Sequence, residues 1–363
     1  MAISNMTPKD RISAFIKLEG VDRIPVIDGT TTAALGKELM GVSVKDFCAE
    51  MGDLAFKVIK TTYDAIGWDN VEMGQSCSLE AEALGSVLKY PEDTYPMLSK
   101  PAAPQPEDVD KLRVPDPLRD GKLPLMLRTV ELLAEEYRKR NVPVAAWVNG
   151  VGNMLLQVRG VENTLADLKI RPDVSRKLLN IVGKTAVEWG KALINSGADM
   201  IDQSEVLGVR EYLSADFVKG FLFSWWYWPL REWKRQGAYV YTHDCGLGCP
   251  DIRILPLLDA DFYWPSNLAN LGKYKAVLGL MNHKAIAGNI DPAGALLMGT
   301  PEDVINDARR AIREGTTPEQ PEGFALIPGC SVAINTPLTN CKAMMHAAET
   351  HGKYPLKILR ALR

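Results

Sequence analysis

The 363-residue sequence has no long hydrophobic run and no long run of charges of one sign. No segment approaches the roughly 18 uninterrupted apolar residues that a membrane-spanning helix needs, and the most apolar stretch, 221–230, is short and rich in aromatic residues. The net charge is −3, whereas a nucleic-acid-binding surface needs clustered basic residues. We therefore expect neither a membrane nor a nucleic acid as a partner.

Targeting signals and zinc-knuckle motifs are missing as well. The first ten residues contain neither an apolar signal core nor an arginine-rich amphipathic leader, which predicts a cytoplasmic protein. In the cytoplasm the six cysteines would be reduced, so their expected roles are packing, metal binding or catalysis. Paired Cys-x-x-Cys knuckles, which are typical of structural zinc sites, do not occur.

The sequence also lacks internal repeats, low-complexity tracts and an obvious linker. We therefore expect one domain over residues 1–363, with an N-terminal helical extension. The proline-rich segment 100–123 is predicted to be a surface excursion of that domain. The composition, 46% hydrophobic and 24% charged, is that of a globular protein, and the length suits a single α/β barrel, which takes about 250 residues or more.

Short β-rich runs alternate with amphipathic helical stretches along the chain. The predicted strands are Arg23–Asp28, Asn70–Met73, Val142–Asn149, Asp199–Gln203, Ala238–His243, Asp261–Trp264, Ala285–Asn289 and Phe324–Pro328. The predicted helices between and after them include Pro172–Ser196, Ser214–Gln236, Pro301–Glu314 and Thr339–Glu349. This alternation predicts a parallel sheet. Eight strands favour an α/β fold of the closed (β/α)8 TIM-barrel type, and a doubly wound open sheet is the alternative.

One β-rich run ends in two potential metal ligands, His243 and Cys245. Residues i and i+2 of an extended chain point to the same side, so both side chains can aim at one point. Imidazole and thiolate together suit zinc. A histidine bonded to a backbone carbonyl beside a buried cysteine would give the same pattern, so the pair alone does not define a site.

A third potential ligand, Cys330, follows the last predicted strand. If the two runs are the fifth and eighth strands, their carboxyl ends open on the same face of the barrel, where active sites of this fold are built. Three protein ligands with an open fourth position describe a catalytic zinc. Cys249 is an alternative third ligand because it lies four residues after Cys245. The other cysteines are predicted to pack in the interior: Cys48, Cys77 and Cys341.

Polar residues at other strand ends are candidates for substrate binding: Asn149, Asp202, Gln203, Glu205 and Asn289. Each could instead cap the helix that follows, and Asp291 before Pro292 is predicted to be only a cap. Asp244 lies between the two proposed ligands and should point to the opposite side, as a supporting or surface group. Glu80 and Glu82 are either an acid–base pair or surface residues.

An aromatic cluster occupies 221–233, in the predicted helix that precedes the run with His243. Its side chains either pack against the barrel or form a contact for a partner protein or for a second subunit of a homodimer.

Several of these motifs resemble the uroporphyrinogen decarboxylase superfamily. They are Leu79–Gly85, Thr242–Gly246, Gly288–Pro292, Gly299–Val304, Pro328–Ser331 and Thr336–Asn340. Because they run in order from the first quarter of the chain nearly to its end, the resemblance covers most of the sequence. It implies a (β/α)8 barrel.

The resemblance implies one of two chemistries. The true decarboxylases are metal-free and carry an N-terminal Arg-Gln-Ala-Gly-Arg-Tyr segment that grips porphyrinogen carboxylates. Here the corresponding region, 26–32, has no such segment, and no arginine occurs between Arg23 and Arg113. The other branch resembles cobalamin-dependent methyltransferases of the coenzyme M type, whose zinc ligands are His-x-Cys and a distant Cys. This sequence matches that pattern at His243, Cys245 and Cys330.

The resemblance therefore implies a zinc-dependent methyltransferase. It would move a methyl group between cobalamin, carried by a separate corrinoid protein, and a small substrate. A thiol such as coenzyme M and a methoxylated or methylated donor both suit this chemistry, because zinc can activate a thiol or polarise an ether oxygen. The alternative is a uroporphyrinogen-type decarboxylase that acts on a tetrapyrrole acid.

Overall fold

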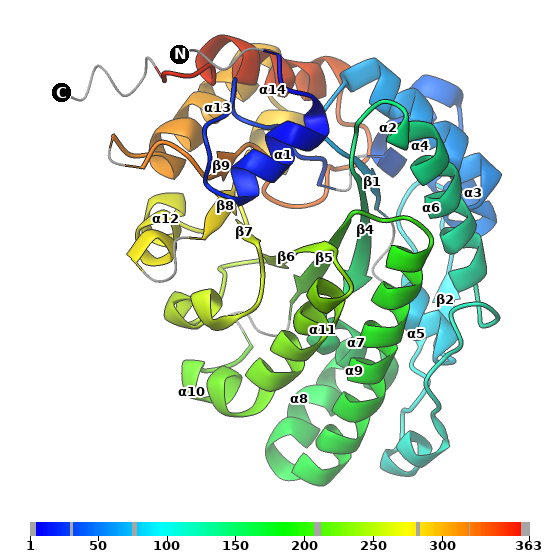
Figure 1. Ribbon diagram of the computed structural model, residues 1–363. Helices are drawn as coiled ribbons and strands as arrows, with labels where there is room; N and C mark the ends of the chain where they lie inside the picture. The colour runs from blue at the N-terminus through cyan, green and yellow to red at the C-terminus, as the bar shows by residue number, and fades with distance from the viewer. Residues whose placement is uncertain are drawn as a thin grey trace.

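The computed structural model describes residues 5–29, 32–74, 78–206, 212–280, 284–318 and 320–356. Seven parallel strands form a curled sheet with helices around it (Figure 1). In chain order they are β1 (Val71–Met73), β4 (Val144–Asn149), β5 (Met200–Glu205), β6 (Tyr239–Asp244), β7 (Phe262–Pro265), β8 (Ala285–Ala287) and β9 (Phe324–Ala325). Their spatial order is the same as their chain order, whereas in a doubly wound sheet the strand order reverses.

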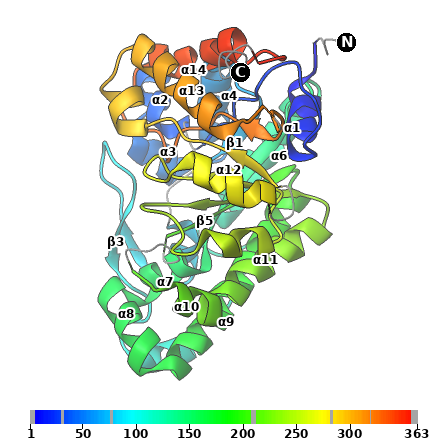
Figure 2. The same ribbon diagram turned by 90° about the vertical axis from the view of Figure 1, so that its left-hand side faces the viewer.

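The helices surround the sheet, and the C-terminal helix packs against an N-terminal one. The α-helices are α1 (Pro8–Ile16), α2 (Thr32–Met40), α3 (Val44–Glu50), α4 (Asp53–Ile66), α5 (Leu79–Ala83), α6 (Leu123–Arg138), α7 (Val151–Arg159), α8 (Val161–Ile170), α9 (Pro172–Asn195), α10 (Ala215–Phe217), α11 (Phe223–Arg235), α12 (Leu271–Leu280), α13 (Pro301–Gly315) and α14 (Leu338–His351). Contacts between α14 and α4 bring the two ends of the helical layer together (Figures 1 and 2).

Shorter elements complete the fold. They are the antiparallel pair β2 (Val87–Lys89) and β3 (Met97–Lys100), the 3₁₀-helices η1 (Pro106–Lys111) and η3 (Ile252–Leu257), and the π-helical turns η2 (Val218–Leu222) and η4 (Pro292–Leu297). The proline-rich segment after β3 contains η1 and is tied to α7, because Ala103 N donates to Val158 O at 2.8 Å. Within the described ranges, no helix is both long and apolar enough to cross a membrane.

The predicted helices agree with the structure except at one place. Helix α9 begins with Pro172 at its first turn, and Gly197 beyond its end has a φ of +107°, as helix-end chemistry requires. Helix α13 begins with a capping box between Thr300 and Asp303. The predicted helix Ser214–Gln236 is divided into α10, η2 and α11, because the chain forms a π-helical turn in its middle.

The first predicted strand, Arg23–Asp28, is not a strand in the structure. Val26 forms one parallel bridge to Leu326, just beyond β9, and Arg23 forms one antiparallel bridge to Lys353. On the other side, Val26 N bonds to the Asp69 carboxylate at 2.8 Å and Asp28 N to the Asn70 side chain at 2.7 Å. Asp69 N also donates to Val26 O at 2.8 Å, so one backbone bond and two side-chain bonds join this segment to the residues around the start of β1. Within the described residues the contacts do not extend into a continuous eight-stranded ladder.

The alternation of side chains along the strands creates two core layers. Met200, Tyr241 and Phe262 belong to the inner layer, whereas Ile201 and Val240 face the helices. Helix α1 covers the inner layer at the amino ends of the strands, since the Phe15 and Phe262 rings lie 5.2 Å apart and Ser13 bonds to Tyr239. A shift of one residue would therefore move a side chain from one layer to the other.

Candidate metal centre

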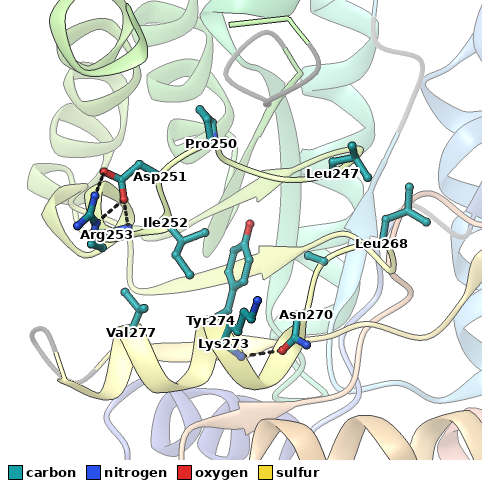
Figure 3. A pocket seen from close by; sticks show the side chains of 11 residues that line it. Leu247, Pro250, Asp251, Ile252, Arg253, Leu268, Asn270, Lys273, Tyr274 and Val277 are labelled. Atoms are coloured by element: carbon teal, nitrogen blue, oxygen red, sulfur yellow. Dashed lines mark hydrogen bonds and ion pairs between the residues drawn. The ribbon is translucent and has the colours of Figure 1, made fainter. Parts of the chain in front are cut away.

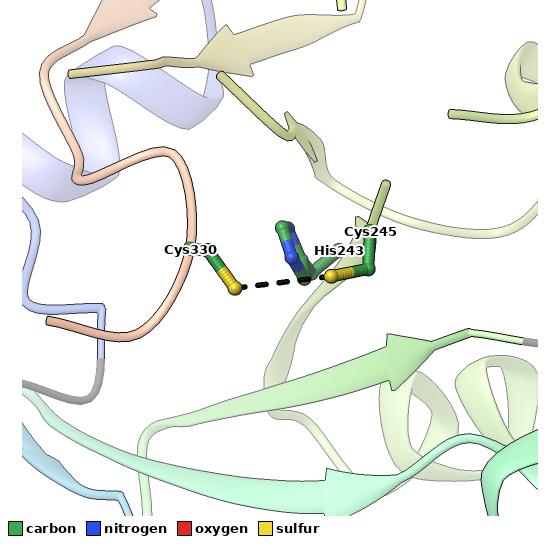
Figure 4. Close-up of side chains that lie close together, drawn as sticks. All are labelled: His243, Cys245 and Cys330. Carbon is green, nitrogen blue, oxygen red and sulfur yellow. Dashed lines mark hydrogen bonds between the residues drawn. The ribbon is translucent and has the colours of Figure 1, made fainter. Parts of the chain in front are cut away.

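Three side chains from distant parts of the chain converge beyond the carboxyl ends of the strands (Figure 4). His243 lies in β6, Cys245 directly follows that strand, and Cys330 lies in the loop after β9. The potential ligand atoms of the three residues all lie within 4.8 Å of one another. The Sγ atoms of Cys245 and Cys330 are 3.8 Å apart although 85 positions separate the residues.

This donor set fits zinc. Two sulfurs bound tetrahedrally at about 2.3 Å would lie about 3.8 Å apart, which is the spacing of Cys245 and Cys330. His243 Nδ1 lies 2.8 Å from Trp264 O, and because a carbonyl only accepts, the nitrogen donates. Its Nε2 is buried with no hydrogen-bond partner among the described residues. The tautomer held by Trp264 therefore leaves Nε2 free to bind a metal.

The two thiols lie too close together to ionise easily by themselves. The hydrogen bond with Cys330 and burial raise the pKa of Cys245 to about 12. A divalent cation reverses this effect, because it stabilises the thiolate that binds it. The pair is therefore suited to a bound cation.

A glycine brings Cys330 into place. A Cβ at Gly329 would lie 2.5 Å from the backbone nitrogen of Asn267 and 2.8 Å from its Cα. This close approach is stabilised by hydrogen bonds from Gly329 N to Ile290 O at 2.7 Å and from Asn267 N to Gly329 O at 3.2 Å. A side chain at 329 would push the loop, and with it Cys330, away from Cys245.

Trp264, in β7, contacts both halves of the cluster. Its carbonyl accepts from His243, and the two rings lie 4.1 Å apart. Its indole Nε1 donates to Pro328 O at 2.7 Å, two residues before Cys330. One buried residue thus orients the histidine and anchors the loop that carries the distant cysteine.

Cys249, the alternative third ligand, is not part of the cluster. It is fully buried, its N–H donates to Asp244 Oδ2 at 2.8 Å, and its Sγ lies 3.4 Å from Asp251 O. Two other cysteines, Cys48 and Cys341, are buried as predicted. Cys77 lies outside the described residues.

Asp244 is buried and bonded within the fold, which agrees with the supporting role predicted for it and not with the surface alternative. Its Oδ2 accepts from the Tyr274 hydroxyl at 2.5 Å and from the Cys249 amide. Burial raises the pKa of Asp244 to about 6. Tyr274 also lines an outer cavity of about 440 Å³ between α12 and the loop after β6, with Leu247 and Lys273 (Figure 3). Asp244 therefore connects the ligand-bearing loop to α12.

Asn149 shares the inner face of the sheet with His243. The register aligns Asn149 with Ser204 and Ser204 with His243. The Asn149 backbone and side-chain amides donate to the Glu80 carboxylate at 2.9 and 2.5 Å. Glu80 is fully buried, which excludes the surface alternative for it, and burial raises its pKa. Glu82 is partly exposed and bonds to Tyr90 instead, so the two glutamates do not act as a pair.

Asp202 also lies on the inner face of the sheet. It is fully buried, one carboxylate oxygen accepts from Ser204 Oγ at 2.7 Å, and Oδ1 has no hydrogen-bond partner among the described residues. Burial raises the pKa of Asp202 to about 7, and the charge of His243 opposes this rise. Asp202 is therefore available to a ligand on the side of the sheet where the metal cluster lies.

The other three substrate candidates are less suitably placed. Gln203 and Glu205 alternate with Asp202 and lie on the helix side of β5, where Glu205 accepts from Gly152 N at 3.1 Å. Asn289 is engaged within the fold: its Nδ2 donates to Ser266 O at 2.8 Å, and its Oδ1 accepts from Arg310 at 3.1 Å. Asp291 caps η4, as predicted.

Two tryptophans of the aromatic cluster are buried, in agreement with the packing interpretation. Trp226 donates to Thr242 Oγ1 at 2.9 Å, and Trp233 donates to Val187 O at 3.2 Å. Sequence reasoning missed four inner-face residues near the metal cluster, namely Trp147, Ser204, Tyr241 and Trp264. Strand alternation could have identified two of them, because Trp147 precedes Asn149, and Tyr241 precedes His243, by two positions.

A curled parallel sheet with helices outside it and polar groups at the carboxyl ends of its strands defines the class of barrel-like α/β proteins. Within that class, the chain matches the uroporphyrinogen decarboxylase (URO-D) family over residues 7–351 and belongs to that family.

Two relatives of this chain carry methyltransferase names. The chain is 23% identical over 351 residues to the methylcobamide:CoM methyltransferase MtbA of Methanosarcina mazei, with 96% of this chain and 99% of the relative covered. It is 24% identical over 358 residues to the methylcobamide:CoM methyltransferase MtaA of Methanosarcina barkeri, with the same coverage of 96% and 99%. A solved methyltransferase from Methanosarcina mazei shares the fold, with a TM-score of 0.84 at 22% identity over 95% of this chain and 99% of that chain.

Proposed function

We propose that this protein is a zinc-dependent methyltransferase that moves a methyl group between cobalamin, carried by a separate corrinoid protein, and a small substrate. The observation that carries the proposal is the convergence of His243, Cys245 and Cys330, three donors that suit zinc and leave a fourth position for a substrate. The names of the relatives MtbA and MtaA support it.

We also infer that the segment 23–28 closes the curled sheet into a barrel through its contacts with Leu326 and Asp69.

The residues of this chain would prepare the reaction in three ways. Trp264 keeps His243 in the tautomer that presents Nε2, and Gly329 lets Cys330 approach Cys245. Zinc held by these ligands would act as a Lewis acid that activates a thiol or polarises an ether oxygen. The carboxyl ends of the strands, where the ligands gather, provide the side from which a corrinoid protein could reach the substrate.

The decarboxylase alternative would need N-terminal arginines that are free to bind the carboxylates of the substrate, and the two arginines near the N-terminus are already paired. Arg11 is ion-paired with Asp22 and Asp69, and Arg23 also pairs with Asp69 at 2.7 Å. These pairs are buried or nearly so, which leaves neither guanidinium for the carboxylates of a porphyrinogen. Neither of these two arginines is therefore available to bind a tetrapyrrole acid.

A cobalamin assay tests the proposal. Zinc-loaded protein with methylcobalamin and a suitable thiol should produce the absorption band of cobalt(I), and with cobalt(I) and a methyl ether the band should disappear. His243→Ala and Cys245→Ala should abolish both changes. Cys48→Ala should not, because Cys48 is buried in α3 and is not part of the metal cluster. A cobalt spectrum that no thiol or ether alters, together with loss of carbon dioxide from uroporphyrinogen, would establish the decarboxylase instead.

A further inference from the structure

A row of three large polar side chains crosses the inner face of the sheet. Trp147 in β4 is in register with Asp202 in β5, which is in register with Tyr241 in β6. Met200 and Tyr241 belong to the inner core layer, and Asp202 has the same orientation as Met200 because it is two positions away. Trp147 is related in the same way to Ala145, another inner residue. All three side chains therefore face the interior of the curled sheet.

Each of these side chains has a polar atom without a partner. Trp147 Nε1, Asp202 Oδ1 and the Tyr241 hydroxyl are buried and form no hydrogen bond with any of the described residues. Trp147 is 4% exposed, and the other two are 0% exposed. Buried polar groups are nearly always paired in folded proteins, and unpaired ones cluster where a ligand or an enclosed water completes them. Three in one row indicate a group that the site encloses.

The row lies one layer below the metal cluster. His243 follows Tyr241 by two positions in β6, so its side chain lies on the same face, about 7 Å nearer to the carboxyl end of the strand. A corrin macrocycle is too large to enter the sheet interior, so it would approach the metal from the open side. A substrate whose reacting atom sits at the metal can then direct its far end inward, toward Trp147, Asp202 and Tyr241.

We infer that this row recognises a hydroxyl group on the substrate, and that the enzyme acts on a thiol or a methyl ether that also carries an alcohol or phenol group. The inference rests on the proposed function. A hydroxyl offers one donor and two acceptor lone pairs. It can accept from the Trp147 indole and the Tyr241 phenol while donating to Asp202. The stacked Tyr241 and Phe262 rings, 4.4 Å apart, form an apolar wall beside it.

Charged groups fit the row less well. An ammonium group cannot accept from Trp147, and a sulfonate cannot donate to Asp202 when that carboxyl is ionised. The seven strands of the sheet carry no lysine or arginine, whereas Glu72 and Asp202 supply carboxylates on its inner face. Above pH 7, where Asp202 is mostly ionised, an anionic tail would meet like charge in a buried site. The chain should therefore differ in substrate from the relatives named for CoM, 2-mercaptoethanesulfonate.

Two-carbon thiols of equal length test the inference. Zinc-loaded protein and methylcobalamin are combined with 2-mercaptoethanol, ethanethiol, cysteamine or 2-mercaptoethanesulfonate, and kcat/KM is measured from the cobalt(I) band. In the opposite direction, cobalt(I) is combined with 4-methoxyphenol or methoxybenzene. In each reactive series the hydroxyl compound should have the highest kcat/KM. The inference is overturned if 2-mercaptoethanesulfonate has the highest kcat/KM of the thiols. It is also overturned if the hydroxyl group does not change kcat/KM, which is the result expected if an enclosed water binds the three atoms instead.

Variants of the row provide a second measurement. Tyr241→Phe should reduce the preference for 2-mercaptoethanol over ethanethiol by about three- to tenfold, the effect of one lost hydrogen bond. Trp147→Phe should reduce it similarly if Tyr241→Phe does not fold. The matched control is Tyr239→Phe, on the same face of β6 but one layer further from the metal, where the hydroxyl bonds to Ser13 at 3.1 Å. The control should keep the wild-type preference, and an equal loss there would overturn the inference.

A binding measurement separates this inference from the proposed function. If no thiol or ether changes the cobalt spectrum, the proposed function fails. The increase in melting temperature of the zinc-loaded protein with 2-mercaptoethanol and with ethanethiol then decides the inference. A larger increase with 2-mercaptoethanol, lost in Tyr241→Phe, supports hydroxyl recognition, and equal increases refute it.

Discussion

The imidazole of His243 is oriented by the fold before any metal binds. Its Nδ1 donates to Trp264 O at 2.8 Å, and its Nε2 has no partner among the described residues. A ligand that is held in place in this way loses little conformational freedom when the metal binds. The metal site should therefore be tight, and it should depend on each of its three donors.

Each of the variants His243→Ala, Cys245→Ala and Cys330→Ala removes one of three protein ligands. We therefore expect each to lower zinc affinity by about tenfold to 100-fold. Zinc content by elemental analysis and competition with a chromophoric chelator measure this effect. Cys249→Ala is the matched control, since its sulfur lies near Asp251 O and outside the cluster. Loss of zinc from Cys249→Ala, with full zinc in Cys330→Ala, would exchange the roles of the two cysteines.

Asp202 should make the metal-free protein less stable at neutral pH. Burial raises its pKa to about 7 from an ordinary value of 3.8. The folded chain then holds the proton more tightly than the unfolded chain, so the free energy of unfolding falls as pH rises from about 4 to about 7. Asp202→Asn removes this loss. Its stability advantage over the wild type should grow by on the order of 2 kcal/mol between pH 5 and pH 8.

Denaturant unfolding of the metal-free protein at several pH values measures this advantage. The control is Asp120→Asn, because Arg113 lowers the pKa of that partly exposed carboxyl to about 2, and it stays ionised throughout this range. An Asp202→Asn advantage that does not change with pH would mean that the carboxyl titrates normally in the folded protein.

At the scale of elements, β7 connects the two ligand-bearing segments. Trp264 bonds to His243 through its carbonyl and to Pro328 O through its indole. Trp264→Phe keeps the carbonyl and an aromatic ring but loses the bond to the Cys330 loop. We expect a roughly tenfold loss of zinc affinity, in the range seen when groups that support metal ligands are removed, measured by chelator competition on protein shown to be folded.

The control for this variant is Trp233→Phe. Trp233 is equally buried and its indole also donates to a carbonyl, that of Val187, but it lies in α11 on the helix side of the sheet. It should lose stability without losing zinc affinity. Equal effects of the two substitutions on zinc binding would show that Trp264 acts only through packing.

The whole molecule has a core that does not depend on the metal. Two hydrophobic cores of buried side chains fill the inner layer and the helical layer. The three potential metal ligands lie apart from most of this core, at one end of the sheet. Chelation of zinc should therefore abolish methyl transfer but leave the protein folded, with a fall in melting temperature of a few degrees. Circular dichroism before and after chelation measures this. Global unfolding on chelation would identify the metal as structural.

Sequence periodicity predicted seven of the eight strand positions and the long helices α9, α13 and α14, because alternation, helix caps and glycines act over a few residues. It also predicted a barrel-like α/β fold. It was wrong for Arg23–Asp28, where the side chains of Asp69 and Asn70, more than 40 positions away, take two of the hydrogen bonds that a strand ladder would make.

The chemistry of the proposed site was determined by the sequence alone. The spacing of His243 and Cys245 at a strand end points both toward one side, and imidazole and thiolate suit zinc in any fold. The tertiary structure decided which cysteine joins them, because the 3.8 Å approach of Cys330 depends on the curl of the sheet and the contact of Gly329 with Asn267.

Strand register and burial were likewise decided only by the tertiary structure. Asp202 and Gln203 are adjacent in the sequence, yet the register with β6 puts Asp202 on the same face as His243 and Gln203 on the other. From the sequence, Glu80 could be an acid–base group or a surface residue, and only the fold shows that it is buried against Asn149. Local interactions set how each segment folds, whereas the pairing of distant segments depends on the closing of the whole sheet, which no short stretch of sequence specifies.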